Sequence, residues 1–428
     1  MRKTLALAVA SAAVASAAVA GCSGTAASTG PGAGHVTGVL RGTASAEPAA
    51  SPRPFGSADT AFGLDVLRAW CAGEPDANLV FSPSTLSSAL GLAYLGARGT
   101  TATAMARVLH LPVTEPGALA AGLRSRTRAL AGASGPGVTL SASDQVWADP
   151  SLPPLRGYLN AVATAYDAGL NQVPLRTDPG QAAQRINAAV SAATRGHIPQ
   201  LVSPAMLDGT GWVLTSALYM DAKWATPFNP SRTRPGTFTT AAGQPVSASF
   251  MNGGSFADGF ADGWTAVSLP YAGGKLAMTA LLPPAGSAAC ALPATSTLGT
   301  LTADVARSRV GYGLRATVAL PKVNLSVSAD MDGVLTQLGM GVAFRPGQAN
   351  LSGLSPDAGD IAFVRQAATF QVGEQGTVAS AAVAIGVAPT AVSIAPRAIT
   401  FNRPYLMLVT DTATGEPLFL ARVANPAA

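Results

Sequence analysis

The side chains that most often perform catalysis or bind metals are few in this chain, and their spacing fits no known catalytic or metal-binding pattern. The three histidines, His35, His110 and His197, lie far apart, and no H-E-x-x-H or C-x-x-C spacing occurs. No G-x-S-x-G motif exposes a nucleophile, no glycine-rich loop is suited to phosphate, and no lysine has a serine three residues upstream. The sequence therefore predicts no catalytic residue, no metal site and no cofactor, and we do not expect an enzyme.

The composition indicates a globular domain and argues against a nucleic-acid partner. The chain has 428 residues, of which 48% are hydrophobic, so a sizeable core is possible. Its 27 basic and 22 acidic residues give a formal charge of +5 without a cluster of basic side chains. A nucleic-acid partner is therefore not expected.

The most unusual segment runs from Gln375 to Pro396 and contains no charged residue. In its first half, apolar or small residues alternate with mostly small ones, and no proline occurs before Pro389. This alternation is typical of a strand that can be buried. On periodicity alone, an ordinary core strand followed by a loop is the favoured interpretation.

The elements that must position this segment follow from periodicity and capping signals. Apolar spacing predicts helices over residues 59–70, 83–95, 101–109, 155–168 and 179–194, the first capped by Asp59 and the second by Ser82. Strands are predicted over 213–222, 265–270, 276–282, 317–327, 367–373, 405–409 and 417–423, with a short helix over 330–338. Helices that precede strands favour a single α+β domain.

The N-terminus is predicted to be a targeting segment. A positive start and an apolar stretch end in Val19-Ala20-Gly21-Cys22, which resembles a bacterial lipobox. This resemblance implies a signal peptide over residues 1–21, lipidation of Cys22, and a location on the extracellular face of the cell membrane. A plain secretory signal, which would give a secreted protein, is the alternative. Residues 22–57 are rich in Gly, Ala, Ser and Pro and are predicted to form a flexible tether to a domain over residues 58–428.

Two cysteines remain after Cys22. Cys71 and Cys290 could pair in an oxidising compartment, or both could be buried free thiols. The sequence leaves both possibilities open.

Several motifs, in order along the chain, resemble the serpin family of serine protease inhibitors. Glu374-Gln375-Gly376-Thr377-Val378-Ala379-Ser380-Ala381-Ala382 is similar to the serpin hinge. The segment Ile399-Thr400-Phe401-Asn402-Arg403-Pro404-Tyr405 is similar to the family's C-terminal signature, with Tyr405 where Phe is commonest. Further matches begin near Thr60 and include Asn78-Leu79-Val80-Phe81-Ser82-Pro83 and Leu95-Gly96-Ala97-Arg98-Gly99-Thr100.

The resemblance implies a fold of eight to nine helices around three β-sheets, with an exposed reactive-centre loop. It also implies a suicide inhibitor, whose loop is cleaved by a serine protease in a covalent acyl-enzyme and then inserts into the central sheet. The predicted hinge begins at the acid Glu374 and continues with residues that are flexible or small enough to permit insertion: Gly376, Thr377, Ala379, Ser380, Ala381 and Ala382.

The reactive bond follows from the family's spacing. The residue before the cut lies sixteen beyond the hinge acid Glu374, which gives Thr390–Ala391. Counting back from the C-terminal signature points nearer to Ser393, so the cut lies between Ala388 and Ile394. Every choice in this range places a small or aliphatic residue at the cut, which favours elastase-like or subtilisin-like targets.

The resemblance also assigns residues that control sheet opening. Lys322 and Glu374 match a family salt bridge at the end where insertion begins, and Trp224 lies in the same region. Ser82 and Thr85 match a hydrogen-bond cluster in the middle of the sheet, in which Ser216 and Gln366 stand where the family often has Asn and His. Sheet opening is therefore expected to be tuned differently in this chain.

The remaining expectations are a monomer that interacts with a serine protease and, through its N-terminal lipid, with a membrane. The alternative function is a non-inhibitory, chaperone-like binding protein with the same fold, which would be cleaved without trapping the protease. The hinge favours the inhibitor, because it lacks the bulky, charged or proline residues typical of non-inhibitory members.

Overall fold

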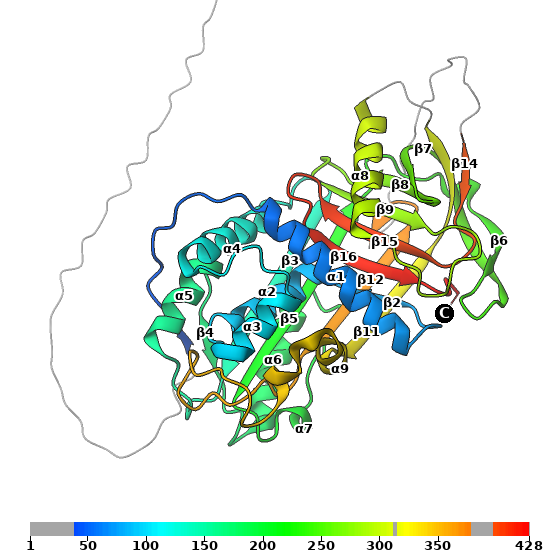
Figure 1. Ribbon diagram of the computed structural model, residues 1–428. Helices are drawn as coiled ribbons and strands as arrows, with labels where there is room; N and C mark the ends of the chain where they lie inside the picture. The colour runs from blue at the N-terminus through cyan, green and yellow to red at the C-terminus, as the bar shows by residue number, and fades with distance from the viewer. Residues whose placement is uncertain (1–37, 311–314, 378–396, 428) are drawn as a thin grey trace, which may run out of the picture. The chain divides into compact units, whose positions relative to one another are not determined.

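The computed structural model describes residues 38–310, 315–377 and 397–427, and these contain nine α-helices and two hydrogen-bonded networks of strands (Figure 1). No described helix is both long and apolar enough to cross a membrane. The predicted α+β fold is confirmed.

A seven-stranded sheet runs through the molecule. Its strands follow the order β1, β4, β3, β5, β13, β12, β11. Their bounds are β1 Val39–Leu40, β3 Val138–Ala148, β4 Leu170–Gln172, β5 Trp212–Lys223, β11 Val323–Asp330, β12 Arg365–Gly373 and β13 Gly376–Thr377. We call the end at Lys223 and Gly373 the hinge end of this sheet, and the end at Trp212 and Ala148 its far end.

The second network has nine strands and joins two of the predicted three sheets through the long strand β7. The first part of β7 pairs with β6 and β10, and its last part pairs with β8. The strands are β2 Leu79–Phe81, β6 Arg234–Thr239, β7 Pro245–Ala261, β8 Trp264–Pro270, β9 Leu276–Leu282, β10 Ala316–Pro321, β14 Ala398–Thr400, β15 Tyr405–Asp411 and β16 Pro417–Val423.

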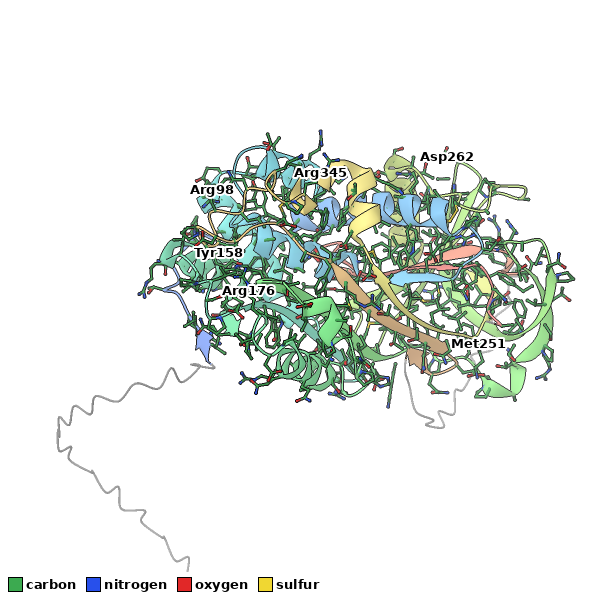
Figure 2. All side chains as sticks on the ribbon, turned by 90° about the horizontal axis from the view of Figure 1, so that it is seen from below. Arg98, Tyr158, Arg176, Met251, Asp262 and Arg345 are labelled. Carbon is green, nitrogen blue, oxygen red and sulfur yellow. A yellow bond between two sulfur atoms is a disulfide. The ribbon has the colours of Figure 1, made fainter. Side chains whose placement is uncertain are left out.

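The helices pack on these strands and bury separate apolar clusters. They are α1 Arg53–Gly73, α2 Pro83–Tyr94, α3 Gly99–Val108, α4 Pro116–Ala131, α5 Arg156–Tyr166, α6 Pro179–Ala193, α7 Pro204–Leu207, α8 Thr295–Val310 and α9 Asp332–Leu335, with short turns at Pro230–Arg232, Thr336–Met340 and Gly341–Phe344. One cluster contains Tyr158 and a second contains Met251; these two residues lie toward opposite ends of the described domain in Figure 2.

Local signals explain most element boundaries. The Ser82 side chain accepts a hydrogen bond from the Thr85 amide at the start of α2, and Pro83 occupies its first turn. The strands predicted over 265–270 and 276–282 are confirmed as β8 and β9, which pair antiparallel from Thr265–Leu282 to Pro270–Ala277. Four long elements, α4, β3, β7 and α8, were not predicted.

Two predicted boundaries are wrong. The first helix begins at Arg53 and not at an Asp59 cap, because prolines are tolerated in a first helical turn and allow the helix to start earlier. The strand predicted over 317–327 is two strands in different networks, β10 and β11, separated at Lys322. Pro321 has no amide hydrogen to donate, and this gap in the ladder accompanies the change of sheet.

The predicted tether over residues 22–57 is too long. Val39 and Leu40 pair with β4, and the amides of Thr43 and Ser45 donate to the side chains of Asn160 and Thr164. These bonds, with one from the Ser125 hydroxyl to the Ala50 carbonyl, hold residues 39–50 on the domain, although their composition is that of a linker. Cys22 lies outside the described residues.

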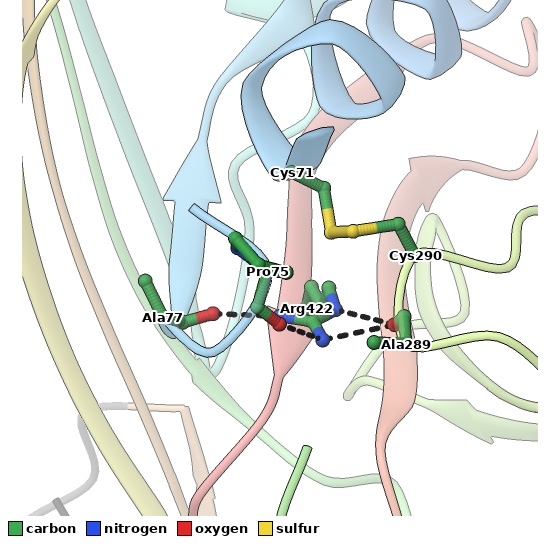
Figure 3. The surroundings of a disulfide bond; sticks show 6 residues. All are labelled: Cys71, Pro75, Ala77, Ala289, Cys290 and Arg422. Atoms are coloured by element: carbon green, nitrogen blue, oxygen red, sulfur yellow. Dashed lines mark hydrogen bonds between the residues drawn. A yellow bond between two sulfur atoms is a disulfide. The ribbon is translucent and has the colours of Figure 1, made fainter. Parts of the chain in front are cut away.

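The two cysteines left open by the sequence form a disulfide. Cys71, at the end of α1, is bonded to Cys290 in the connection between β9 and α8, across 219 residues of sequence (Figure 3). Arg422 on β16 lies next to it and donates hydrogen bonds to the carbonyl oxygens of Pro75, Ala77 and Ala289. The disulfide and the arginine together connect three segments that are distant in sequence.

Candidate functional site

The first residues of the uncharged segment lie inside the seven-stranded sheet. Gly376 and Thr377 form β13, which pairs antiparallel with β12 on one side and antiparallel with β5 on the other. Thr377 is opposite Val372 and Ala222, and its side chain is buried. The chain thus turns back at the end of β12 and starts a new strand between β12 and β5.

The turn that makes this reversal is held by backbone hydrogen bonds. The amide of Trp224 donates to the carbonyl of Gln375 at 2.9 Å, and the amide of Phe228 donates to that of Glu374 at 2.8 Å. The indole Nε1 of Trp224 donates to the carbonyl of Gly373, also at 2.9 Å. The predicted role of Trp224 at the hinge end therefore has a geometric basis, because it binds the last residue of β12 and the turn that follows.

Only glycine fits at position 376 in this conformation. Its φ is +152°, which side-chain-bearing residues rarely adopt, and a Cβ atom there would lie 2.0 Å from the carbonyl oxygen of Ala222. Gly376 therefore allows the chain to lie against the backbone of β5.

A hydroxyl pair and an aromatic stack anchor β13 at the hinge end. The hydroxyls of Thr377 and Tyr271 lie 2.6 Å apart, and both side chains are buried. The Tyr271 ring stacks on Trp224 with a centroid separation of 4.5 Å. Burial raises the pKa of Tyr271 above its usual range, so its hydroxyl keeps its proton as a hydrogen-bonding group.

The ion pair that the resemblance implied is present. Lys322 Nζ lies 3.0 Å from Glu374 Oε2, and the Thr233 hydroxyl donates to Glu374 Oε1 at 2.9 Å. Burial alone would raise the pKa of Glu374, but hydrogen bonds and the charge of Lys322 together lower it. Glu374 is therefore a carboxylate at neutral pH, next to the turn that starts the inserted strand.

From the end of β13 to the middle of the sheet, its two neighbours β5 and β12 are not paired with each other. β5 and β12 are parallel and pair at three positions, Thr215–Arg365, Ser216–Gln366 and Ala217–Ala367. From there to the hinge end, each strand is paired on its outer side, β5 with β3 and β12 with β11. An extension of β13 would enter this interval antiparallel to both strands.

The predicted middle cluster lies where this interval closes. Gln366 Nε2 donates to the Ser82 carbonyl at 3.0 Å and lies 3.5 Å from the Thr85 hydroxyl. The Ser216 hydroxyl and Gln366 Oε1 are buried without a hydrogen-bond partner among the described residues. Because unpartnered buried polar atoms lower stability, this closure is weaker than a fully bonded cluster would be.

Asp144 belongs to the same row of the sheet and was not predicted as a site residue. Asp144 is on β3, opposite Ser216 of β5, and its Oδ1 is buried without a hydrogen-bond partner among the described residues. Burial raises the pKa of Asp144 to about 7, although the charge of Arg126 opposes the shift. The only signal in the sequence is an acid within an otherwise uncharged strand.

Arg126 on α4 organises a buried charged cluster beneath this row. It forms ion pairs with Asp59 at 2.7 Å and Glu416 at 2.8 Å and donates to the Ser88 hydroxyl. Burial, together with Asp59, raises the pKa of Glu416 well above its usual value despite Arg126. The cluster therefore joins α1, α2, α4 and the residue before β16.

The remaining predicted residues lie outside the described part of the chain. They are the hinge residues Ala379, Ser380, Ala381 and Ala382, and the reactive bond Thr390–Ala391. Among the described residues, no group of three or more His, Cys, Asp or Glu side chains could hold a metal ion.

Known proteins are similar to this chain over most of its length. Residues 57–426 match the family model described as Serpin (serine protease inhibitor). An uncharacterized serpin-like protein of Thermococcus kodakarensis is 30% identical over 377 residues, covering 87% of this chain and 86% of that protein. The human leukocyte elastase inhibitor is 27% identical, covering 86% of this chain and 99% of that protein.

Solved structures agree with the fold. The thermophilic serpin tengpin in its native state aligns with a TM-score of 0.73 at 21% identity, covering 90% of this chain and 97% of that one. Protease nexin-1 with heparin gives the same TM-score at 23% identity, covering 88% and 100%. Together with a strand that begins between β5 and β12, these matches show that the chain belongs to the serpin family.

Proposed function

We propose that this serpin is a suicide-substrate inhibitor of serine proteases. A protease would attack the loop between β13 and β14, and its catalytic serine would form an ester with the residue before the cut as the peptide bond breaks. The cleaved loop would then insert between β5 and β12 before water hydrolyses the ester. The observation that carries this proposal is β13, which supplies the first two residues of that strand in the correct direction.

The free energy for insertion is available from the residues that follow β13. Strand addition, for which serpin loop insertion is an established example, forms ladder hydrogen bonds worth about 0.5–1.5 kcal/mol each. Burial of Val383, Ile385 and Val387 would add about 1.5–3 kcal/mol for each side chain. The intervening Ala379, Ser380, Ala381 and Ala382 are small enough to pass between separating strands.

The target class follows from the proposed reactive bond, Thr390–Ala391. No residue between Ala388 and Ile394 carries a basic side chain, and the first base after the hinge is Arg397. Elastase-like or subtilisin-like proteases, which accept small or aliphatic residues, are therefore the proposed targets.

The proposed location is the extracellular face of the cell membrane, through lipidation of Cys22 after removal of residues 1–21. Two acyl chains on one residue give stable anchoring. Expression of the full chain in a bacterium with lipoprotein processing should place it in the membrane fraction, and Cys22→Ser should move it to the soluble fraction. An unchanged distribution for the variant would contradict lipidation.

The inhibitor is tested by mixing the protein with pancreatic elastase and with subtilisin and resolving the products by SDS gel electrophoresis. We expect a covalent complex whose mass is the sum of the protease and the larger serpin fragment. The variant Ala381→Arg, which carries a long charged side chain into the buried face of the new strand, should be cleaved at the same bond without forming the complex. Cleavage of the wild-type protein without any complex would instead support the non-inhibitory alternative.

A further inference from the structure

The strands next to the two ends of the uncharged segment carry an unbalanced charge. β6, β10, β14 and the first part of β7 contain no aspartate or glutamate, and the sequence has neither from Ala222 to Ala257. These strands and their flanking residues nevertheless carry exposed cations: Arg232, Arg234, Arg315, Lys322 and Arg397. The formal charge of the whole chain is only +5. Much of the excess positive charge is therefore concentrated around one group of strands.

Three of these arginines lie along β7. The Arg232 side chain lies beside Gly253, where an added Cβ would be 3.8 Å from its Nη1. Arg315 Nη1 donates to the Ser255 carbonyl at 3.3 Å, a little further along the same strand. Arg234 begins β6, which pairs with the first part of β7. Arginines from separate parts of the sequence therefore gather along one strand without an intervening acid.

Arg397 extends this group to the end of β7 and covers an exposed aromatic ring. Its Cζ lies 3.9 Å from the centroid of the Phe260 ring, and Phe260 is 40% exposed. The Arg397 carbonyl accepts a hydrogen bond from the Thr317 amide at 2.9 Å, which holds its backbone beside β10. Arginine and aromatic residues are enriched at protein–protein interfaces, so the composition of this surface is that of an interface.

We call Arg232, Arg234, Arg315 and Arg397 the basic patch. None of the four forms an ion pair with a described carboxylate. Lys322 is not included, because its charge is paired with a hinge glutamate. Asp258 is close enough to Arg397 for their charges to interact, but Asp258 is buried. The patch therefore presents positive charge to solvent that no described acid neutralises.

The basic patch borders both ends of the segment that a protease would have to bind. Thr233, between Arg232 and Arg234, donates from its hydroxyl to Glu374 at the turn before β13. At the other end of the segment, Arg397 directly precedes β14. A protease that holds the loop between β13 and β14 is therefore brought beside the patch.

We propose that the basic patch docks the target protease and selects, among elastase-like or subtilisin-like enzymes, those with an acidic surface beside the catalytic cleft. This inference rests on the proposed function, because it concerns the partner of the same loop. Complementary charges around an interface steer the encounter and raise the association rate. A polyanion would need the charge alone, whereas the position at both loop ends and the exposed Phe260 ring fit a protein partner.

The test uses subtilisin in two forms, acetylated on its lysines, which removes their charge, or succinylated, which replaces each positive charge with a carboxylate. The measured quantity is the second-order rate constant for loss of the intact serpin, per titrated active site, and it counts covalent complex and cleaved product together. At low salt the succinylated form should react about tenfold faster than the acetylated form. The difference should disappear at about 1 M salt, because salt screens exposed charges.

The patch variant combines Arg232→Gln, Arg234→Gln and Arg315→Gln, and Arg397 is left unchanged because it adjoins the loop. Its rate constant with succinylated subtilisin at low salt should fall about tenfold, to that of the acetylated form. Its melting temperature should equal that of the wild type, because the three side chains are exposed.

The matched control variant combines Arg156→Gln, Arg185→Gln and Arg345→Gln, which remove the same charge from exposed arginines without ion pairs. Arg345 lies well away from Met251 of β7 in Figure 2. The control variant should keep the preference for succinylated subtilisin. Equal rate constants for the patch and control variants would overturn the proposal. Loss of heparin retention in the patch variant, with its rate constants unchanged, would assign the patch to a polyanion and also overturn it.

The same measurements separate this inference from the proposed function. A covalent complex whose rate of formation is independent of protease charge would contradict the docking surface alone. Cleavage without a complex, at a rate that depends on protease charge and on the patch, would contradict the inhibitor alone. If neither form of subtilisin consumed the wild-type chain, both proposals would be wrong.

Discussion

The hydroxyls of Tyr271 and Thr377, 2.6 Å apart, form a side-chain hydrogen bond between β13 and the loop after β8. Because both residues are buried, removal of one partner leaves the other hydroxyl unsatisfied. Thr377→Val should therefore lower the free energy of unfolding by about 1–3 kcal/mol, measured from the first transition in urea.

The double variant Tyr271→Phe, Thr377→Val provides the control for this hydrogen bond. Replacing both partners leaves no unsatisfied hydroxyl, so the double variant should be more stable than Thr377→Val alone. Additive losses from the two substitutions would contradict a direct interaction.

Gly376→Ala should expel β13 from the sheet. The new Cβ would lie 2.0 Å from the Ala222 carbonyl, and the residue would have to keep a positive φ. We expect amide hydrogen exchange to accelerate at Gly376 and Thr377. Gly373→Ala is the matched control, because a Cβ at Gly373 meets no atom within 4 Å, and it should leave the exchange rates unchanged. Equal protection in the two variants would show that position 376 does not require glycine.

Thr390→Arg should convert the specificity of the inhibitor. A trypsin-like protease binds a basic residue before the cut, and the segment from Ala388 to Ile394 offers none. The variant should form a covalent complex with trypsin that the wild-type protein does not form. If Ser393→Arg gives the trypsin complex and Thr390→Arg does not, the reactive bond lies three residues further along.

The Cys71–Cys290 disulfide should contribute substantially to stability, because it closes a long loop of sequence. Loss of such a link typically lowers the free energy of unfolding by about 2–4 kcal/mol. The melting temperature of the wild-type protein should fall in dithiothreitol. The double variant Cys71→Ala, Cys290→Ala should start at the lower value and not respond to the reductant.

Asp144 should make stability depend on pH. Its folded pKa of about 7 exceeds its ordinary value of 3.8, so the folded state binds more protons than the unfolded state between these values. Stability should therefore fall as pH rises from about 4 to 7 and then level off. The free energy of unfolding of Asp144→Asn, relative to that of the wild type, should therefore rise by about 2–4 kcal/mol between about pH 4 and pH 7. A stability difference that is the same at pH 5 and pH 8 would contradict the shift.

Much of the fold could be predicted because capping and turn residues mark the same element boundaries as the pattern of apolar residues. The Ser82-Pro83 start of α2 and the β8–β9 hairpin depend on capping and turn residues that are visible in sequence. β10 and β11 were predicted as one strand, although the alternation changes phase between them: Val318 and Leu320 are buried before Lys322, and Val323 and Leu325 after it, where the two strands join different sheets. Residues 39–50 were wrongly predicted as linker. Their backbone bonds attach them to the domain, and such bonds cannot be recognised from composition.

Site residues that belong to a sequence motif could be predicted. Those whose role depends on contacts between distant segments could not. The resemblance identified Lys322, Glu374 and Trp224, which the structure brings together at the hinge end. Asp144 and Arg126 were missed because their partners come from strands and helices far away in sequence. Gly376 was assigned for its flexibility, but its steric role depends on the Ala222 carbonyl of another strand.

The position of β1 has a directional consequence. The N-terminal segment joins the domain beside β4, at the far end of the seven-stranded sheet, whereas β13 begins at the hinge end. A strand that grows from Thr377 along β5 would carry an attached protease toward the end from which the polypeptide leads back to Cys22. Insertion would therefore bring a captured enzyme to the end of the sheet at which the N-terminal segment enters the domain.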